Sequence, residues 1–334
     1  MPHSLRIATF NLESLDDRPD LAPPLADRIA VLRPQILRLE ADVLCLQEVN
    51  GQRPPGGGPR RLLALDRLLE ETPYAGYHRV SSTRVFGPEG ERRGARGVDA
   101  VHNLVILSRF PIRASAELRH DLVAAPRYRP VTARPAAAEA EAVEWDRPIL
   151  SAAIDLPGGR VLHVVNLHLR APLAAPVAGQ KADSLTWNSV AGWAEGFFLA
   201  TMKRAGQALE TRLLIDRIFV AEPEALIAVC GDFNAEERQT PLRTIRGDPD
   251  DIGNPGLAAR RLVPLERTLP ESQRFSVVHA GHKEMLDHVL VSPALLACYR
   301  AVEVDNRDLP DELSDAGPAS HHAPLVATFE LPEA

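Results

Sequence analysis

Polar side chains that can bind a cation or move a proton stand repeatedly at the ends of apolar segments of this chain. A carboxylate, amide or imidazole is costly to keep at such a position unless it meets a cation, a phosphate or another polar group. The residues are Asn11, Glu48, His168, Asp232 and Asn234, followed by Asp287, His321 and His322 before two further apolar segments. The pattern predicts one polar site along a sheet edge.

Asp232 and Asn234 form the strongest local signal, because they follow a buried strand two residues apart. Side chains at that spacing in extended chain point the same way, so both can meet one substrate group or one cation. The alternative is a strand-end turn capped by the aspartate. Glu48 also ends an apolar segment, and it suits a hard cation such as Mg²⁺ or is a simple surface carboxylate.

Histidines supply the proton chemistry in this interpretation. His168 shares a strand face with Asn166 and can transfer a proton or donate to a phosphoryl oxygen; a buried structural histidine is the alternative. Asp287 and His322 each precede a strand. An aspartate that accepts from one imidazole nitrogen makes the histidine a general base or a stabiliser of developing charge.

The segments that must position these residues alternate between strand and helix patterns. Apolar runs predict strands, and one-sided leucine and isoleucine patterns predict helices. The expected strands are 5–10, 42–47, 103–107, 149–156, 161–167 and 225–230, and the expected helices are 27–39, 61–71 and 205–219. Because the candidate site residues span the whole chain, a single α/β domain over 1–334 with an insertion at about 173–203 is the economical prediction.

Composition restricts the classes of protein that fit. The 334 residues carry a formal net charge of −7, which argues against the overall positive field of proteins that bind long nucleic acids. The three cysteines are separated and two lie in apolar runs, so free thiols in a reducing compartment are expected. Neither a secretion signal nor a run of about 20 apolar residues is visible. We therefore expect a cytoplasmic protein without stable membrane insertion, and no protein partner is indicated.

Several short motifs together resemble the endonuclease/exonuclease/phosphatase superfamily, which includes pancreatic deoxyribonuclease, abasic-site endonucleases, inositol polyphosphate phosphatases and neutral sphingomyelinases. They occur in family order between residues 5 and 329. The motifs are Thr9-Phe10-Asn11, Leu46-Gln47-Glu48-Val49, Ile106-Leu107-Ser108-Arg109-Phe110-Pro111, Asn166-Leu167-His168, Gly231-Asp232-Phe233-Asn234, Leu286-Asp287-His288 and Ser320-His321-His322-Ala323-Pro324.

The resemblance implies a four-layer α/β/β/α sandwich of two packed mixed sheets, and a phosphoester substrate hydrolysed by in-line attack of water. It implies that Glu48 and Asn11 bind a divalent metal, Mg²⁺ or Mn²⁺. By the same resemblance, the aspartate and asparagine of the Gly-Asp-Phe-Asn motif align the water, and His168 contacts the phosphate or leaving group. Asp287 would orient His322, and Arg147 and Asn166 would contact the substrate.

One position departs from the family pattern. The family has Ser-Asp-His where this chain has Ser320, His321 and His322, so an imidazole replaces a carboxylate that often adds a metal contact. As a metal ligand, His321 would soften the site and favour Mn²⁺ over Mg²⁺, or leave one metal bound. The segment 98–103 contains no glutamate that could orient His168, and Asp99 is the nearest candidate.

Three functions remain in competition. A nuclease needs a basic groove, which five scattered arginines would have to supply. These are Arg92, Arg93, Arg96, Arg127 and Arg129. A phosphatase or phosphodiesterase acting on a small molecule or lipid headgroup needs only a compact basic pocket. A catalytically impaired binding module is the third alternative.

Overall fold

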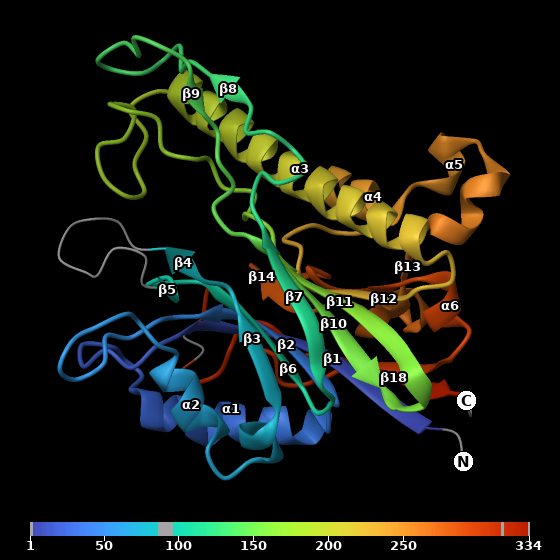
Figure 1. Ribbon diagram of the computed structural model, residues 1–334. Coiled ribbons are helices and arrows are strands. Elements are labelled where there is room, and N and C mark those ends of the chain that lie inside the picture. The colour runs from blue at the N-terminus through green and yellow to red at the C-terminus, as the bar shows by residue number, and fades with distance from the viewer. Residues whose placement is uncertain (1–2, 86–95, 315–316, 333–334) are drawn as a thin grey trace.

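The chain folds into two six-stranded sheets packed face to face, with helices on both outer faces (Figure 1). The computed structural model describes residues 3–85, 96–314 and 317–332. Arg92 and Arg93, which the sequence suggested for a basic groove, lie outside this range. The arrangement confirms the predicted four-layer α/β/β/α sandwich.

The first sheet carries the N- and C-terminal strands. Its order is β17 (Tyr299–Val304), β18 (Leu325–Leu331), β1 (His3–Leu15), β2 (Val43–Val49), β6 (Asn103–Ser108) and β3 (His78–Ser81). Helices α1 (Leu25–Leu39) and α2 (Leu63–Leu69) cover its outer face. Helix α1 buries Leu25, Leu32, Ile36 and Leu39 there, which is the stripe expected of an amphipathic helix.

The second sheet comes from the middle of the chain. Its order is β13 (Val263–Pro264), β16 (Asp287–Val291), β12 (Leu226–Asp232), β11 (Arg160–His168), β10 (Ile149–Leu156) and β7 (Ile112–Leu118). Helices α3 (Val190–Ala221) and α4 (Thr240–Arg246) cover its outer face (Figure 1). A tight turn at Pro157–Gly159 joins β10 to β11, as the two glycines predicted.

The remaining elements are short. The strands are β4 (Arg84–Val85), β5 (Arg96–Gly97), β8 (Arg127–Tyr128), β9 (Glu141–Ala142), β14 (Val277–His279) and β15 (His282–Glu284), and the α-helices are α5 (Pro249–Ile252) and α6 (Pro293–Leu296). Short 3-10 helices span Pro73–Gly76, Pro255–Arg260, Leu265–Thr268 and Glu271–Gln273. Over the described parts of the chain, no helix has both the length and the apolar character that crossing a bilayer requires.

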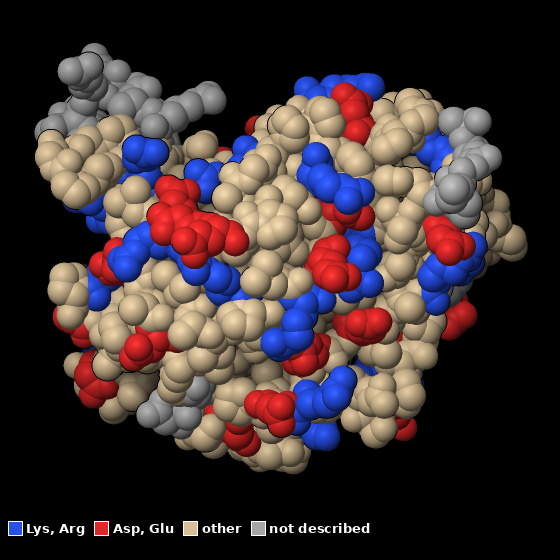
Figure 2. Space-filling view, turned by 90° about the horizontal axis from the view of Figure 1, so that it is seen from below, with Lys and Arg blue, Asp and Glu red and all other residues tan. Residues whose placement is uncertain are grey.

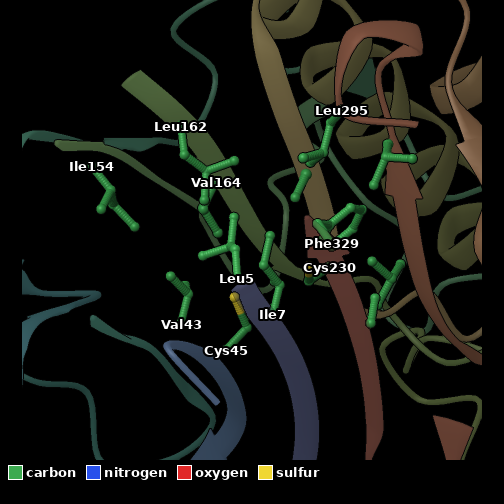
Figure 3. Close-up of a cluster of buried hydrophobic side chains, with 14 of the residues drawn as sticks. Leu5, Ile7, Val43, Cys45, Ile154, Leu162, Val164, Cys230, Leu295 and Phe329 are labelled. Atoms are coloured by element: carbon green, nitrogen blue, oxygen red, sulfur yellow. The ribbon is translucent and has the colours of Figure 1, made fainter. Parts of the chain in front are cut away.

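Apolar side chains from both sheets fill the space between them (Figure 3). Leu5, Ile7 and Val43 meet Leu162 and Val164 in this core, and all five are fully buried. Cys45 and Cys230 lie in the same layer as free thiols, as their positions in apolar runs predicted. Strands buried on both faces explain why the sequence shows near-continuous apolar runs rather than alternation.

The long helix α3 differs from the prediction. A partly helical insertion at about 173–203 and a separate helix at 205–219 were expected, but one helix of 32 residues, Val190–Ala221, joins the second part of the insertion to the predicted helix. It begins where the Ser189 hydroxyl accepts a hydrogen bond from the Gly192 amide, a normal N-cap. The N-terminal half of α3 projects past the sheet (Figure 1) and leaves Trp193 and Phe197 partly exposed, which hid the helical period in the sequence.

Candidate active site

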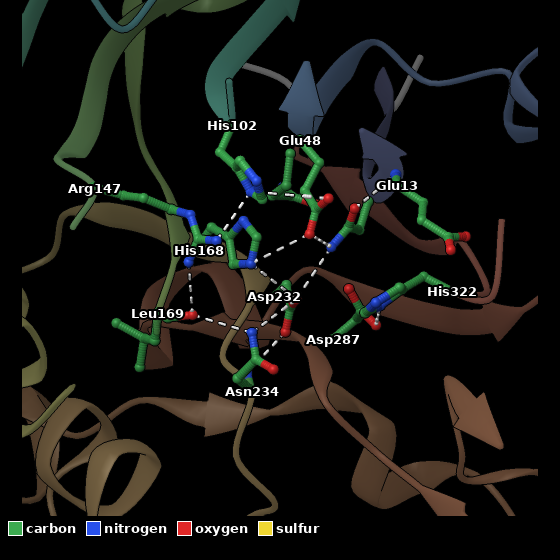
Figure 4. A network of polar contacts seen from close by, with 12 residues as sticks. Glu13, Glu48, His102, Arg147, His168, Leu169, Asp232, Asn234, Asp287 and His322 are labelled. Carbon is green, nitrogen blue, oxygen red and sulfur yellow. Dashed lines mark hydrogen bonds and ion pairs between the residues drawn. The ribbon is translucent and has the colours of Figure 1, made fainter. Parts of the chain in front are cut away.

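Strand ends from both sheets meet at one place and bring the candidate residues together (Figure 4). Asn11 lies on β1 and Glu48 near the end of β2, its parallel neighbour. His168 ends β11 and is paired in register with Asp232 at the end of the parallel strand β12. Asp232 is paired on its other side with Asp287, the first residue of β16. The sheet registers therefore fix the spacing of the site.

Glycine is required immediately before Asp232. Gly231 has φ of +140°, and a Cβ atom there would lie 1.9 Å from the Leu167 carbonyl oxygen. Two site residues also adopt left-handed backbone conformations, with φ of 56° at Glu48 and 47° at Asn234. Such conformations cost free energy in residues with a side chain, and they concentrate at functional sites.

An amide and an imidazole link the two carboxylates at the centre of the site. Asn11 Nδ2 donates to Glu48 Oε1 at 3.3 Å and to Asp232 Oδ2 at 3.1 Å. His168 Nε2 lies 3.7 Å from Glu48 Oε1 and 3.3 Å from Asp232 Oδ2. Asn234 Nδ2 donates to Asp232 Oδ2 at 3.0 Å. All of these atoms face one small volume between the two sheets.

Burial and neighbouring charges set the protonation states at this centre. Burial, together with the Asp287 charge, raises the pKa of Asp232 to about 7. Burial and the Arg147 charge hold the pKa of His168 well below its ordinary value, so this imidazole is neutral. Burial alone would raise the pKa of Glu48, but the charges of His102 and Arg147 lower it. Glu48 is therefore a carboxylate at neutral pH.

Asp287 and His322 form the pair that the sequence suggested. His322 Nδ1 and Asp287 Oδ2 are 2.8 Å apart. Burial alone would lower the pKa of His322, but the Asp287 carboxylate, with Asp232 and Glu48, raises it to about 10. Of the two roles left open, the cationic ring favours stabilisation of negative charge over general-base catalysis.

The neighbourhood of His168 contains a residue that the sequence analysis missed. The rings of His102 and His168 are 5.9 Å apart, and His102 Nδ1 lies 3.8 Å from Glu48 Oε2. Arg147 Nη2 is 2.9 Å from the same His102 nitrogen, which places Arg147 beside the site. Asp99 does not orient His168, since the buried Nδ1 of His168 has no hydrogen-bond partner among the described residues. His102 immediately precedes a strand, so its position carried the same signal as the other site residues.

His321 lies away from the proposed metal centre. Its Nδ1 and backbone amide each lie 2.7 Å from a carboxylate oxygen of Glu13, and its Nε2 lies 3.2 Å from the Ser314 carbonyl oxygen. Both ring nitrogens are thus engaged with acceptors, and the structure gives no support to a metal-ligand role. Glu13, which the sequence analysis did not single out, holds the ring there.

Asn166 lies deeper than a substrate can reach. It is fully buried, and its Nδ2 donates to the carbonyl oxygens of Leu46 at 3.0 Å and Val105 at 2.9 Å. Its Oδ1 accepts from Gln47 Nε2 at 2.8 Å, and Gln47 also hydrogen-bonds Thr9. Asn166 therefore ties the two sheets together, and the predicted substrate contact is corrected to this structural role.

Two groups of side chains offer donor sets for a divalent cation. One is Glu48 with His102 and His168, and the other is Asp232 with Asp287 and His322; within each group the ligand atoms lie within 4.8 Å of one another. The buried Oδ1 of Asp287 has no hydrogen-bond partner in the described structure. Buried carboxylates and an orphaned oxygen fit a cation. Asn11 fits less directly, because its Oδ1 accepts from the Glu13 amide at 2.9 Å.

Comparisons with known proteins identify the family. The model of the Endonuclease/Exonuclease/phosphatase family matches residues 8–315, and the chain therefore belongs to this family. Its members include metal-dependent phosphoesterases and nucleases, which hydrolyse phosphoester bonds. No curated protein sequence matches the chain.

Solved structures share the fold at low sequence identity. The truncated TDP2 of Caenorhabditis elegans has a TM-score of 0.56 and 15% identity, covering 98% of this chain and 97% of that one. A family protein of Bacteroides vulgatus has a TM-score of 0.56 and 17% identity, covering 99% and 100%. Another from Beutenbergia cavernae has a TM-score of 0.53 and 18% identity, covering 98% and 72%. These likenesses establish the fold.

Proposed function

We propose that this protein is a divalent-metal-dependent phosphoesterase that hydrolyses a phosphodiester or phosphomonoester by in-line attack of water. One observation carries the proposal: His168 Nε2 lies within 3.7 Å of Glu48 and 3.3 Å of Asp232, although the three residues come from strands of two different sheets. Such convergence of buried titratable groups is expected of a catalytic site.

Each side chain has a task in this reaction. Asp232, with a pKa raised to about 7, accepts a proton from the attacking water, and Asn234 helps to hold that carboxylate in place. His168 is neutral and faces the substrate phosphate or its leaving group. The positively charged His322, oriented by Asp287, stabilises the negative charge that grows on the phosphoryl oxygens.

Glu48 would hold the metal, with His102 as a nitrogen donor beside it. A bound Mg²⁺ or Mn²⁺ supplies electrostatic neutralisation of the phosphate and activation of water. The imidazoles beside Glu48 favour Mn²⁺ over Mg²⁺, because imidazole suits transition ions. The sequence analysis based the preference for Mn²⁺ on His321. In the structure the imidazole beside Glu48 belongs to His102 instead.

An activity screen tests the proposal. Purified protein is assayed with Mg²⁺, Mn²⁺ or Ca²⁺ against p-nitrophenyl phosphate, bis-p-nitrophenyl phosphate, plasmid DNA and single-stranded RNA. We expect turnover of at least one substrate, and a fall in kcat/KM of about a thousandfold in Asp232→Asn. The matched control is Asp216→Asn, which removes a carboxylate from the ion pair with Arg212 on α3. Equal activity in both variants would refute the catalytic assignment.

A small phosphoester is a better candidate substrate than a long nucleic acid. The formal net charge is −7. On the face seen in Figure 2, the described Lys and Arg side chains are interspersed with Asp and Glu and form no continuous basic band. Free thiols at Cys45, Cys230 and Cys298 support a cytoplasmic setting for the reaction.

A further inference from the structure

A pocket of about 380 Å³ opens directly beside the candidate active site. It shares Arg147 and His102 with that site, so a substrate bound at the centre has direct access to it. The other walls come from the ends of β3, β7 and β11 and from the loops before β6 and β10. These lining residues are Ser82, Asp99, Val101, Asn103, Arg119, Asp146, Pro148, Arg170, Ala171 and Leu173.

The pocket has an excess of positive charge. Arg119, Arg147 and Arg170 face two aspartates, Asp99 and Asp146. Asp146 is already compensated: it pairs with Arg170 on one oxygen, and on the other with Lys203 Nζ at 2.6 Å. Burial alone would raise the pKa of Asp146, but Lys203 and Arg170 hold it below its ordinary value.

One of the arginines retains hydrogen-bonding capacity for a ligand. Arg119 is half-buried, and its guanidinium has no hydrogen bond or ion pair with another residue that the structure describes. Arg170 is already engaged, through Nη1 with Asp146 and through Nη2 with the Leu173 carbonyl oxygen at 3.5 Å, and contributes mainly its charge. Guanidinium groups with free donors match the oxygens of a phosphate, which they bind through paired charge-assisted hydrogen bonds.

We propose that this pocket binds a second phosphate group of the substrate, so that the natural substrate is a small phosphoester with two phosphates. The proposal rests on the phosphoesterase function given above and names its substrate class. Arg147 sits between the two positions: it contacts His102 on the catalytic side and lines the pocket on the other. The volume of about 380 Å³ lies in the range of pockets for small molecules.

Binding to the metal-free protein tests the proposal independently of catalysis. Isothermal titration calorimetry compares propane-1,3-diyl bisphosphate with propyl phosphate. We expect the bisphosphate to bind wild-type protein at least about tenfold more tightly, as one additional charge-assisted phosphate contact predicts. In Arg119→Gln this ratio should fall to about threefold or less.

The matched control is Arg113→Gln, which removes an arginine on β7, the strand that ends one residue before Arg119; there Arg113 pairs with Asp155 at the surface. This variant should retain the wild-type ratio. Thermal unfolding of both variants checks that they fold. Since Arg119 has no partner to lose, its replacement should leave the unfolding temperature unchanged.

Several outcomes would overturn the proposal. Equal affinity of wild-type protein for the two compounds would do so, as would a ratio unaffected by Arg119→Gln. A single-stranded oligonucleotide that binds more tightly than the bisphosphate, and that loses affinity in Arg119→Gln, would assign the pocket to nucleic acid instead. If the activity screen fails while the affinity ratio behaves as expected, the pocket stands and only the hydrolytic function is refuted.

Discussion

Replacing Asp287 by asparagine removes the charge that keeps His322 protonated while preserving the shape of the side chain. Asp287 is fully buried, and its Oδ2 lies 2.8 Å from His322 Nδ1. Asparagine can still accept a hydrogen bond from the ring at that position. The change therefore tests electrostatics more than packing.

The expected size follows from the pKa of His322, which rises from an ordinary value of 6.5 to about 10. Each pKa unit corresponds to about 1.4 kcal/mol, so the whole rise corresponds to roughly 5 kcal/mol. Asp232 and Glu48 contribute part of it. Asp287 supplies the largest raising contributions, which also offset the effect of burial. We therefore assign Asp287 at least half of the rise, or ~2.5 kcal/mol, so the pKa of His322 should fall by roughly two units or more in Asp287→Asn.

The sign of the effect on stability follows from the same values. A folded-state pKa above the unfolded one stabilises the protein fully below about 6.5, and this contribution is lost as the pH rises through about 10. Asp287→Asn should thus lower the free energy of unfolding most at or below neutral pH. The difference from wild type should shrink as the pH approaches 10.

Two measurements check this on metal-free protein. Carbon-13 NMR of the histidine rings follows the titration of His322, which is assigned by comparison with His322→Gln. Urea unfolding at several pH values follows the stability. A His322 that titrates near 6.5 in the wild type, or at the same pH in both proteins, would refute the reasoning.

Three further predictions concern strain, buried charge and metal binding. Gly231→Ala should destabilise the protein by about 3 kcal/mol in urea unfolding, because the added Cβ meets the Leu167 carbonyl oxygen; an unchanged midpoint would contradict this close contact between strands. The buried ring of His288 faces Glu266 and a backbone carbonyl. Burial alone would lower the pKa of His288, but the Glu266 carboxylate raises it. Its stabilising contribution should be present below about 6.5 and decline at higher pH, and Glu266→Gln should abolish that decline in pH-dependent unfolding. Glu48→Gln should weaken Mn²⁺ binding at least about tenfold by electron paramagnetic resonance of the free ion, and equal affinity would remove Glu48 from the metal set.

The site residues at strand ends could be predicted from the sequence, because a polar residue after an apolar run marks where a strand leaves the core. Glu48 and Asp232 follow apolar runs whose length fits a buried strand, and the structure brings them together as their positions suggested. The spacing of two that grouped Asn166 with His168 correctly predicted a shared strand face. The shared face does not place both residues at the site, because two residues along a strand span about 6.5 Å. This distance places Asn166 in the interior rather than at the site.

Loop residues were harder to place. His321 and His322 are adjacent in the sequence, yet one turns to Glu13 and the other to Asp287. The direction of a side chain in irregular chain depends on tertiary partners that sequence spacing does not encode. His102 escaped notice for the complementary reason: a glutamate was sought in that region, and the structure provides an imidazole.

The buried polar link between the sheets has a mechanical consequence. Gln47 and Asn166 hydrogen-bond across the mainly apolar layer between the sheets, and this adds a directional contact to the packing of apolar side chains. Gln47 adjoins Glu48 in the chain, and Asn166 is two positions from His168. Sliding one sheet by a single residue would break these hydrogen bonds in a dry interior. This hydrogen bond therefore helps to fix the position of one sheet relative to the other. The space for an ion and a phosphate is thus defined in the unliganded protein.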